Sequence, residues 1–232
     1  MATTAKRQSV AASVRRRVLR SSNRLWRPED FAGAANAVNH ELRRLVDDGE
    51  LVRLRRGLYW RGEKSRWGMT RTPSRSALRE ILGKGEALGA AGWYATNLLG
   101  LSTQVSPVEV LAVTRRPPEG LTGMKVINRA ARSGRRQAKL NDTEVTVLEA
   151  LEGWDRYVEA DSASALRRFV EILRGEQVRV DRLVKASTTE PAVVRERLRA
   201  VLERGGWGEQ AEQVPHARDI RTRKRALQVI GA

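Results

Sequence analysis

The chain has no cysteine and only two histidines among its 232 residues. The lack of cysteine excludes disulfide bonds, thiolate zinc sites and cysteine nucleophiles. His40 and His216 lie far apart in the sequence, and the HExxH, GxSxG and P-loop patterns are all missing. We therefore expect no catalytic site, no metal and no cofactor. A metal-dependent nuclease with scattered carboxylates is the enzyme alternative.

The chain also lacks a long hydrophobic run. Its longest apolar stretch, Leu88 to Leu101, is interrupted by Asn97 and is too short to cross a bilayer. The first residues, MATTAKRQSVAASVRRR, do not contain the apolar segment of a signal peptide. We expect a soluble, cytoplasmic protein with no membrane partner.

Acidic side chains are scarce in the first part of the chain. The formal net charge is +17, and arginine outnumbers lysine 37 to 7. Genome composition bias contributes to the excess of arginine, but it does not explain the uneven distribution of charge. The net charge is +8 over residues 1–62, +10 over 64–139, −4 over 140–217 and +4 over 218–232. This balance predicts a polyanionic partner for the basic part.

Three helices are expected before the first predicted strand. A helix is expected from Ser9 to Arg20, because serine is a good N-cap and valines recur every four residues. A short second helix is expected at Pro28, because proline suits a first helical turn and acidic residues follow it. Phe31 is expected to pack inward. A third helix is expected from Asn36 to Asp48, with an apolar face and Gly49 at its end.

The residues after the third helix predict a two-stranded hairpin. Leu51 to Leu54 and Leu58 to Trp60 have the composition of strands, and Arg55-Arg56-Gly57 separates them. The residues expected to face the helices are Leu51, Leu58 and Trp60. Three helices followed by a hairpin with a cationic turn are typical of a winged helix-turn-helix DNA-binding domain.

In such a domain the third helix enters the major groove, where polar side chains contact base edges. Asn39 can pair with adenine, and Arg43 or Arg44 can pair with guanine. Arginines of the hairpin and of the first helix, with a Lys6-Arg7 arm, can contact phosphates. The predicted DNA-contacting residues are Asn36, Asn39, His40, Arg43, Arg44, Arg53, Arg55, Arg56, Arg15, Arg16 and Arg17. The alternative is that these side chains form the solvated surface of a small helical domain.

The remaining sequence predicts a second domain. Polar residues, glycine and proline in residues 63–74 suggest a linker. Helices are expected at 76–82, 87–99, 143–153, 162–174, 179–186 and 191–204, and strands at 108–114 and 124–128, as a hairpin or as neighbouring strands. The expected fold class is α+β and helix-rich. The expected order is an N-terminal winged helix-turn-helix at 1–62 and a linker at 63–74. A mixed α/β C-terminal domain with a small antiparallel sheet and several helices is expected at 75–217, followed by a basic tail at 218–232.

Carboxylates of the C-terminal half occur at helical spacing. Glu149 with Glu152, and Glu196 with Glu203, alternate with arginines along the chain. This pattern is typical of a solvated helix face. It does not indicate an active site.

Several motifs resemble those of the AbiEi-type antitoxins. Residues 37–60, AVNHELRRLVDDGELVRLRRGLYW, are similar to the winged-helix domain of that family. The matching residues are Leu42, Arg44, Leu45, Gly49, Arg56, Gly57 and Tyr59. Further similar motifs follow in order, namely Leu99-Gly100-Leu101 at a helix end, VLAVTRR at 110–116 and RLRAVLERGG at 197–206. The resemblance covers most of residues 10–206.

The resemblance implies an antitoxin of a type IV toxin–antitoxin and phage-defence system. The N-terminal domain would repress its own operon by binding double-stranded promoter DNA. The C-terminal domain would counteract a nucleotidyltransferase-like toxin, functionally or by direct contact. The short linker and the basic tail depart from the family pattern. The mildly acidic region 140–212 could oppose a basic toxin surface, and ordinary mixed-charge helices are the alternative.

Two other functions stay open at this point. One is a stand-alone winged-helix transcriptional regulator whose C-terminal domain dimerises or senses a ligand. The other is a nucleic-acid-processing enzyme. Either the antitoxin or the regulator could bind DNA as a homo-oligomer. The spacing of its operator half-sites would depend on an oligomer geometry that the sequence does not specify.

Overall fold

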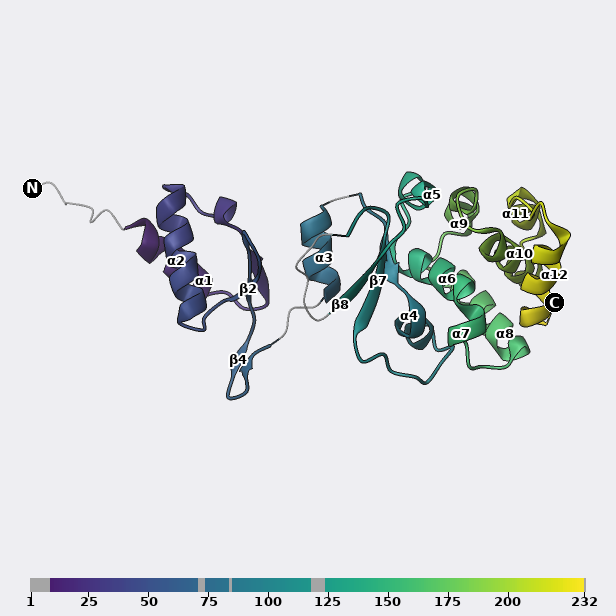
Figure 1. Ribbon diagram of the computed structural model, residues 1–232, viewed down its shortest axis with the longest axis horizontal. Coiled ribbons are helices and arrows are strands. Elements are labelled where there is room, and N and C mark those ends of the chain that lie inside the picture. The colour runs from purple at the N-terminus through teal and green to yellow at the C-terminus, as the bar shows by residue number, and fades with distance from the viewer. Residues whose placement is uncertain (1–8, 71–73, 84, 118–123, 232) are drawn as a thin grey trace, which may run out of the picture. The chain divides into compact units, whose positions relative to one another are not determined.

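The computed structural model describes residues 9–70, 74–83, 85–117 and 124–231 (Figure 1). The protein belongs to the α+β class and is rich in helices with small β-sheets, which confirms the predicted class at this coarse level. The described residues divide into two compact units, one ending at Leu78 and the other beginning at Arg79. They are termed the N-terminal unit and the C-terminal unit below.

The helices of the N-terminal unit lie where the sequence predicts them. α1 spans Val10–Leu19, and the Ser9 hydroxyl accepts a hydrogen bond at 3.2 Å from a backbone amide of the first turn. The short element at the proline is a 3-10 helix, η1, Pro28–Asp30. α2 spans Ala35–Asp47, and Gly49 follows it with a φ of 67°. The N-cap, proline and glycine signals therefore acted as expected.

The N-terminal unit also contains an antiparallel sheet with the strand order β1-β3-β2. Its strands are β1 (Arg24–Trp26), β2 (Val52–Arg55) and β3 (Leu58–Arg61). The predicted hairpin of β2 and β3 is confirmed, and Gly57 in its turn takes a φ of 76°, which glycine adopts without strain. β1 is too short to show an alternating pattern, so the sequence did not predict it.

The core of the N-terminal unit lies between α1, α2 and one face of the sheet. Its buried residues are Val14, Val18, Trp26, Val38, Leu42, Leu45, Leu51 and Tyr59. Leu51 faces the helices as predicted, but Tyr59 joins this core in place of Leu58 and Trp60, so that part of the prediction was wrong. β3 is buried on both faces, and its successive apolar residues therefore do not reveal which face meets the helices.

Residues 63–74, which were expected to form a linker, begin with a second hairpin. It consists of β4 (Lys64–Ser65) and β5 (Gly68–Met69). The Trp60 indole N–H donates a hydrogen bond to the Thr70 carbonyl at 2.7 Å. The described part of this segment is therefore attached to the sheet of the N-terminal unit through β3.

The C-terminal unit contains a three-stranded sheet with the order β6-β7-β8. Its strands are Leu88–Ala90, Glu109–Val113 and Met124–Asn128. β7 and β8 are neighbours, as one alternative predicted, but they run parallel, so the hairpin alternative is wrong. β6 pairs antiparallel with β7, and the sheet is therefore mixed rather than wholly antiparallel.

The segment 87–99 was predicted as one helix, but it contains β6 followed by the shorter helix α4, Gly92–Leu98. A Cβ on Gly89 would lie 2.7 Å from the Val145 side chain, so β6 packs closely against the helix that carries Val145. A short, uniformly apolar segment has no periodicity that separates a strand from a helix. Tertiary packing decided between the two.

Helices form the remainder of the C-terminal unit. Four of the predicted helices are confirmed to within one residue at each end: α6 (Asp142–Glu152), α8 (Ser162–Arg174), α9 (Val180–Ser187) and α10 (Ala192–Gly205). Others are α5 (Ser133–Gln137), α7 (Trp154–Tyr157) and α11 (Gly208–Gln213). α3 (Ser74–Leu82) begins in the N-terminal unit and ends in the C-terminal unit. None of the helices in the described part of the chain is long and apolar enough to span a membrane.

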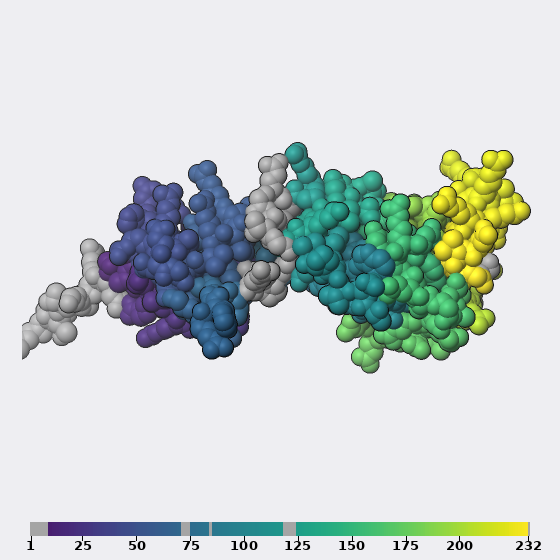
Figure 2. All heavy atoms as spheres, turned by 60° about the horizontal axis from the view of Figure 1, so that its bottom comes forward, coloured from purple at the N-terminus to yellow at the C-terminus, as the bar shows by residue number. Residues whose placement is uncertain are grey.

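The basic segment after residue 217 forms a packed helix. α12 spans Ile220–Ile230, and the Asp219 carboxylate caps it by accepting backbone hydrogen bonds from its first turn. Ala226 and Ile230 are buried, and the helix packs against α10. Figure 2 shows in yellow that this segment covers one end of the C-terminal unit. The expected basic tail is thus part of the folded C-terminal unit.

Candidate nucleic-acid interface

The exposed face of α2 carries three of the predicted contact residues. Asn36, His40 and Arg43 lie about one turn apart, on the face directed away from the core. All three are exposed, and none makes a side-chain hydrogen bond or an ion pair with another described residue. Asn39 is half-buried at the edge of this face. One flat surface could therefore contact several of these side chains together.

Arg15 and Arg44 share a buried carboxylate. Glu41 of α2 is 2% exposed, Arg15 donates to it at 3.0 Å, and the Arg44 guanidinium lies 3.6 Å from it. Arg15 also donates to Asp48 at 2.7 Å. The hydrogen bond that Arg15 donates to Asp48 raises the pKa of Arg15, and the hydrogen bond to Glu41 has the next largest effect in the same direction. Arg15 therefore joins α1 to α2 and neutralises a carboxylate that has little access to water.

Arg17 holds α1 against η1. It donates a hydrogen bond to the Asp30 carbonyl at 2.6 Å, and its guanidinium lies 5.3 Å from the Trp26 ring and 5.5 Å from the Phe31 ring. Phe31 packs against the core and stacks on Trp26, as the predicted inward position requires. Cation–π contacts of this kind stabilise exposed sites by about 0.5–1 kcal/mol. Arg17 thus contributes to packing within the unit.

The hairpin presents three arginines to solvent. Arg55 and Arg56 lie at its turn, Arg53 lies on β2, and all three are exposed. None has an ion pair or a side-chain hydrogen bond with another described residue. A bulge between Arg53 and Arg55 shifts the register of β2 against β3, and bulges increase the local twist of a strand. The guanidinium groups are therefore available to an external anion.

Arginines at the C-terminal end of α1 line a shallow hollow of about 330 Å³. Its lining includes Arg16, Arg17 and Arg20, all exposed. Arg20 was not predicted as a contact, although its spacing of four residues from Arg16 places both on one side of a helix. That spacing is the signal that could have identified it. The Lys6-Arg7 arm lies outside the described residues.

The predicted DNA-contacting side chains differ in whether they already have partners within the protein. Exposed and without a side-chain partner among the described residues are Asn36, His40, Arg43, Arg53, Arg55 and Arg56. Held in ion pairs, hydrogen bonds or ring contacts are Arg15, Arg17 and Arg44. Asn39 is half-buried, and Arg16 is exposed. Contact with DNA stays a prediction for all eleven side chains.

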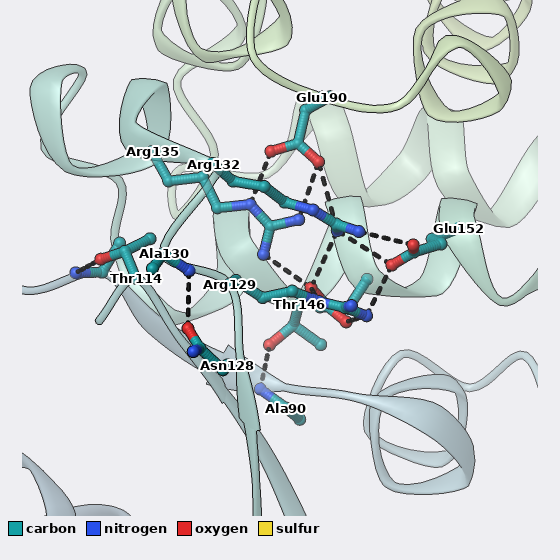
Figure 3. Close-up of polar contacts among 12 residues, drawn as sticks. Ala90, Thr114, Asn128, Arg129, Ala130, Arg132, Arg135, Thr146, Glu152 and Glu190 are labelled. Atoms are coloured by element: carbon teal, nitrogen blue, oxygen red, sulfur yellow. Dashed lines mark hydrogen bonds and ion pairs between the residues drawn. The ribbon is translucent and has the colours of Figure 1, made fainter. Parts of the chain in front are cut away.

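The C-terminal unit contains a largely buried network of three arginines and three glutamates (Figure 3). Its members are Arg129, Arg132, Arg135, Glu149, Glu152 and Glu190. Each carboxylate accepts hydrogen bonds from two or three guanidinium groups. Because opposite charges are equal in number and fully paired, the network connects elements and leaves no free acid or base.

Two glutamates that were predicted to lie on a solvated helix face are in fact buried. Glu149 is 3% exposed and Glu196 is 1% exposed, so the prediction was wrong for both. Arginines from other elements neutralise them: Arg135 lies 2.7 Å from Glu149, and Arg223 lies 3.7 Å from Glu196. Burial opposes the charge on Glu149, but hydrogen bonds from Arg129 and Arg135 outweigh it and lower the pKa.

The described residues contain no cluster of three or more histidines and carboxylates with the geometry to hold a metal ion. The two histidines lie in different units, and His216 contacts Glu196 alone among the carboxylates. The polar groups that the structure brings together in the C-terminal unit are mainly arginines with glutamates.

Comparison with known proteins identifies a family. A family model described as a family of unknown function (DUF6088) matches residues 19–150. No curated protein shows a significant match. The chain is similar to the crystal structure of the RV2827C protein from Mycobacterium tuberculosis, with 16% sequence identity and a TM-score of 0.49, over 97% of this chain and 96% of that chain. Because the family match spans more than half of the sequence, the chain belongs to the DUF6088 family.

Proposed function

We propose that the protein binds double-stranded DNA as a transcriptional repressor, through a winged helix-turn-helix in residues 9–61. The order of elements supports this proposal, since two helical elements precede α2 and a hairpin follows it. The pairing of β1 with β3 supports it too, because this strand anchors the hairpin beside the helices. In such a domain the last helix enters the major groove and the hairpin contacts the backbone.

The observation that carries the proposal is the distribution of unpaired polar groups. Where arginines face acidic neighbours in the N-terminal unit, they are paired, as Arg15 is with Glu41 and Asp48. The side chains of the exposed α2 face and of the hairpin turn have no such partners among the described residues. Unpaired cations beside unpaired amide and imidazole groups match a surface that contacts phosphates and base edges.

Roles follow from the position of each side chain. Asn36 and His40 lie in the N-terminal half of α2, the part of a recognition helix that contacts bases in helix-turn-helix proteins. Arg43 has the fork of donors that pairs with guanine. The N-terminus of α2 carries no side-chain cap, so its first amides suit a phosphate oxygen. Arg55 and Arg56 would contact backbone phosphates or enter the minor groove.

A gel-shift experiment with DNA from upstream of the protein's own gene tests this proposal. We expect the wild-type protein to bind this fragment more tightly than a scrambled sequence of equal length. The Arg55→Ala/Arg56→Ala variant should bind more weakly, because two phosphate contacts are lost. Arg66→Ala is the matched control, since Arg66 lies in the turn of the β4–β5 hairpin, which follows the other end of β3. Equal affinity of both variants and the wild type would refute the role of the hairpin.

We further propose that this repressor is an antitoxin of the AbiEi type. The motif residues that carry the resemblance have positions that explain their residue types. Leu42 and Leu45 are buried, and Gly49 and Gly57 adopt the left-handed conformation that glycine favours. Tyr59 is buried in the core of the same unit. The motif residues therefore determine how α2 packs against the hairpin. Their presence supports an architecture shared with the AbiEi-type antitoxins more directly than a shared activity.

The C-terminal unit would then counteract a nucleotidyltransferase-like toxin. Four of the acidic side chains between residues 140 and 217 are buried, together with two arginines: Glu144, Glu149, Glu190, Glu196, Arg197 and Arg199. The surface is therefore less acidic than the sequence suggests, which weakens the hypothesis of a broad acidic surface for a basic toxin. This observation favours functional neutralisation over docking through charge alone.

Co-expression with the adjacent gene tests the antitoxin proposal. We expect the adjacent gene alone to arrest growth and the full-length protein to restore it. The Arg55→Ala/Arg56→Ala variant should still restore growth when its own expression is driven by an unrelated promoter. If the adjacent gene is not toxic, or if growth is not restored, the protein is better described as a stand-alone regulator. That outcome would leave the DNA-binding proposal intact.

A further inference from the structure

A cavity of about 760 Å³ lies within the C-terminal unit, and the residues that surround it come from both ends of that unit's sequence. α4, β7, β8, α6, α7, α10 and α12 all contribute to its lining. The volume falls in the range of roughly 300–1,000 Å³ that is common for small-molecule sites. None of the residues proposed to bind DNA lines it.

One wall of the cavity is aromatic. Trp93 of α4 and Tyr157 of α7 meet edge to face, with ring centroids 5.3 Å apart and planes at 70°. Both rings are only half-buried. Neither the indole N–H nor the phenol hydroxyl has a hydrogen-bond partner among the described residues. The pair therefore offers both ring surface and donors to a ligand.

The lining also includes three exposed cationic side chains. Lys125 of β8, Arg156 of α7 and Arg225 of α12 line the cavity and are exposed. None of the three forms an ion pair or a side-chain hydrogen bond with another described residue. In contrast, arginines already pair with the three carboxylates of the lining, which are Glu149, Glu152 and Asp155. The cavity thus carries positive charge that the protein does not neutralise.

A buried guanidinium, that of Arg197, also lines the cavity. Arg197 is 1% exposed, and it donates to the carbonyls of Leu151 and Glu152 and to the Asp155 carboxylate. Its Nε is buried without a hydrogen-bond partner among the described residues. Burial lowers the pKa of Arg197, with Asp155 acting in the opposite direction. A buried N–H without a partner beside a cavity favours an occupant that carries a hydrogen-bond acceptor.

We propose that this cavity binds a nucleotide. The base would stack on Trp93 and Tyr157, and the phosphate would lie against Lys125, Arg156 and Arg225. Aromatic rings stack on any base, and cationic side chains bind phosphate oxygens, so the two halves of the lining match the two halves of one ligand. The nucleotide is either free or the end of a single strand. Nucleotide binding in this cavity is independent of DNA binding by the N-terminal unit and of the antitoxin role.

Calorimetric titration of the full-length protein with AMP, adenosine and inorganic phosphate tests the base and the phosphate separately. We expect AMP to bind more tightly than either part alone. Trp93→Ala should weaken AMP binding by about fivefold or more, and Trp93→Phe should retain most of it. Lys125→Ala/Arg156→Ala should bring the affinity for AMP close to that for adenosine, because adenosine lacks the phosphate.

Two controls separate the cavity from general attraction to a basic protein. Lys185→Ala removes an exposed cation of α9 that does not line the cavity, and Arg55→Ala/Arg56→Ala removes cations of the N-terminal unit. Both should bind AMP like the wild type. Lys125 and Arg156 are exposed, so their double variant should fold normally, which circular dichroism can verify.

A short single-stranded oligoadenylate distinguishes the two sources of the ligand. Tighter binding of the oligoadenylate than of AMP, lost in the cavity variants, would assign the site to a strand end. Equal or weaker binding would assign it to a free nucleotide. Absence of binding by both AMP and the oligoadenylate would overturn the proposal. Binding that the Trp93 and Lys125/Arg156 variants leave unchanged would overturn it as well.

Discussion

Arg135 and Glu190 form a doubly hydrogen-bonded ion pair in the interior of the C-terminal unit. Nε lies 2.6 Å from Oε1, and Nη2 lies 2.8 Å from Oε2, with both side chains fully buried (Figure 3). Arg135 also donates to Glu149 of α6 at 2.7 Å. One guanidinium therefore connects α5, α6 and the segment between α9 and α10. Its hydrogen bonds fix the relative orientation of these segments, which apolar contacts do not do.

Glu190→Ala should destabilise the C-terminal unit strongly. The substitution leaves Arg135 buried with a single carboxylate partner, and breaking a buried pair by removing one member costs about 3–5 kcal/mol. Chemical denaturation followed by far-UV circular dichroism measures the change. Glu171→Ala is the matched control, because Glu171 pairs with Arg168 at 3.1 Å on the surface and should contribute about 1 kcal/mol or less. Similar small losses for the two variants would contradict a stabilising role of the network.

The stability of the C-terminal unit should fall in acid because of Glu149. Hydrogen bonds from Arg129 and Arg135 outweigh the effect of burial and lower the pKa of Glu149 in the folded protein. A carboxylate with a lowered folded pKa contributes stability above its unfolded pKa of about 4.3, and that contribution is lost as the pH falls through the folded pKa. The free energy of unfolding should therefore decrease from about pH 5 downwards.

Glu149→Gln isolates this contribution. The amide does not titrate, so the variant should be less stable than the wild type at neutral pH but should lose less stability between about pH 6 and pH 3. Denaturation curves at each pH give the comparison. Parallel pH profiles for the two proteins would show that other carboxylates, such as Glu144 with its lowered pKa beside Arg179, account for the acid sensitivity.

Arg15 should matter for folding more than for DNA binding. Arg15→Ala removes the nearer of the two cations that face the buried Glu41 carboxylate, so the midpoint of unfolding should drop. Arg16→Ala is an exposed control of the same helix and should have a smaller effect. Adding Glu41→Gln to Arg15→Ala should recover part of the loss, because the uncompensated charge is removed. An unchanged midpoint for Arg15→Ala would contradict its packing role.

The hairpin arginines should determine part of the salt dependence of DNA binding. Each lost phosphate contact reduces the slope of log affinity against log salt by about one unit. Arg55→Ala/Arg56→Ala should therefore reduce the slope by about two, and Arg53→Ala should reduce it further if Arg53 also contacts phosphate. Fluorescence anisotropy over a range of salt concentrations measures the slope. A slope equal to that of the wild type would exclude these arginines from the phosphate contacts.

Arg43 should contribute to sequence discrimination. Arg43→Ala should weaken binding to the preferred site by about 1–3 kcal/mol, with a smaller change for unrelated DNA. Arg43→Lys keeps the charge but loses the planar fork that pairs with guanine, so it should lose discrimination and keep non-specific affinity. Competition binding with single-base variants of the site measures both quantities. Equal losses on all sequences would show that Arg43 contacts phosphate rather than a base.

Local chemistry was enough to predict much of the N-terminal unit. Ser9 as an N-cap, Pro28 at the start of a helical turn and Gly57 in a hairpin turn each act on the backbone of their immediate neighbours. The 3.6-residue period of α2 similarly places Asn36 and His40 on the face away from the core. These features depend on interactions within a few residues, so the sequence alone contains them.

The face of a strand and the direction of strand pairing were not predictable in the same way. β3 has apolar residues at successive positions, so the choice of Tyr59 for the helix-facing core depends on what covers each side of the strand. β7 and β8 pair in parallel although they are near in sequence. Both outcomes depend on packing partners that no local pattern contains.

The sequence by itself determined the basic first part, the helix and turn positions of the N-terminal unit and the polar face of α2. The tertiary structure alone decided which charges face solvent. Arg135 and Glu190 are 55 positions apart, and the helical spacing of Glu149 suggested a solvated face until arginines from other elements were brought to it. A charged side chain is stable in the interior only when partners offset its loss of hydration. Those partners come from distant segments, so burial of charge is a property of the folded chain.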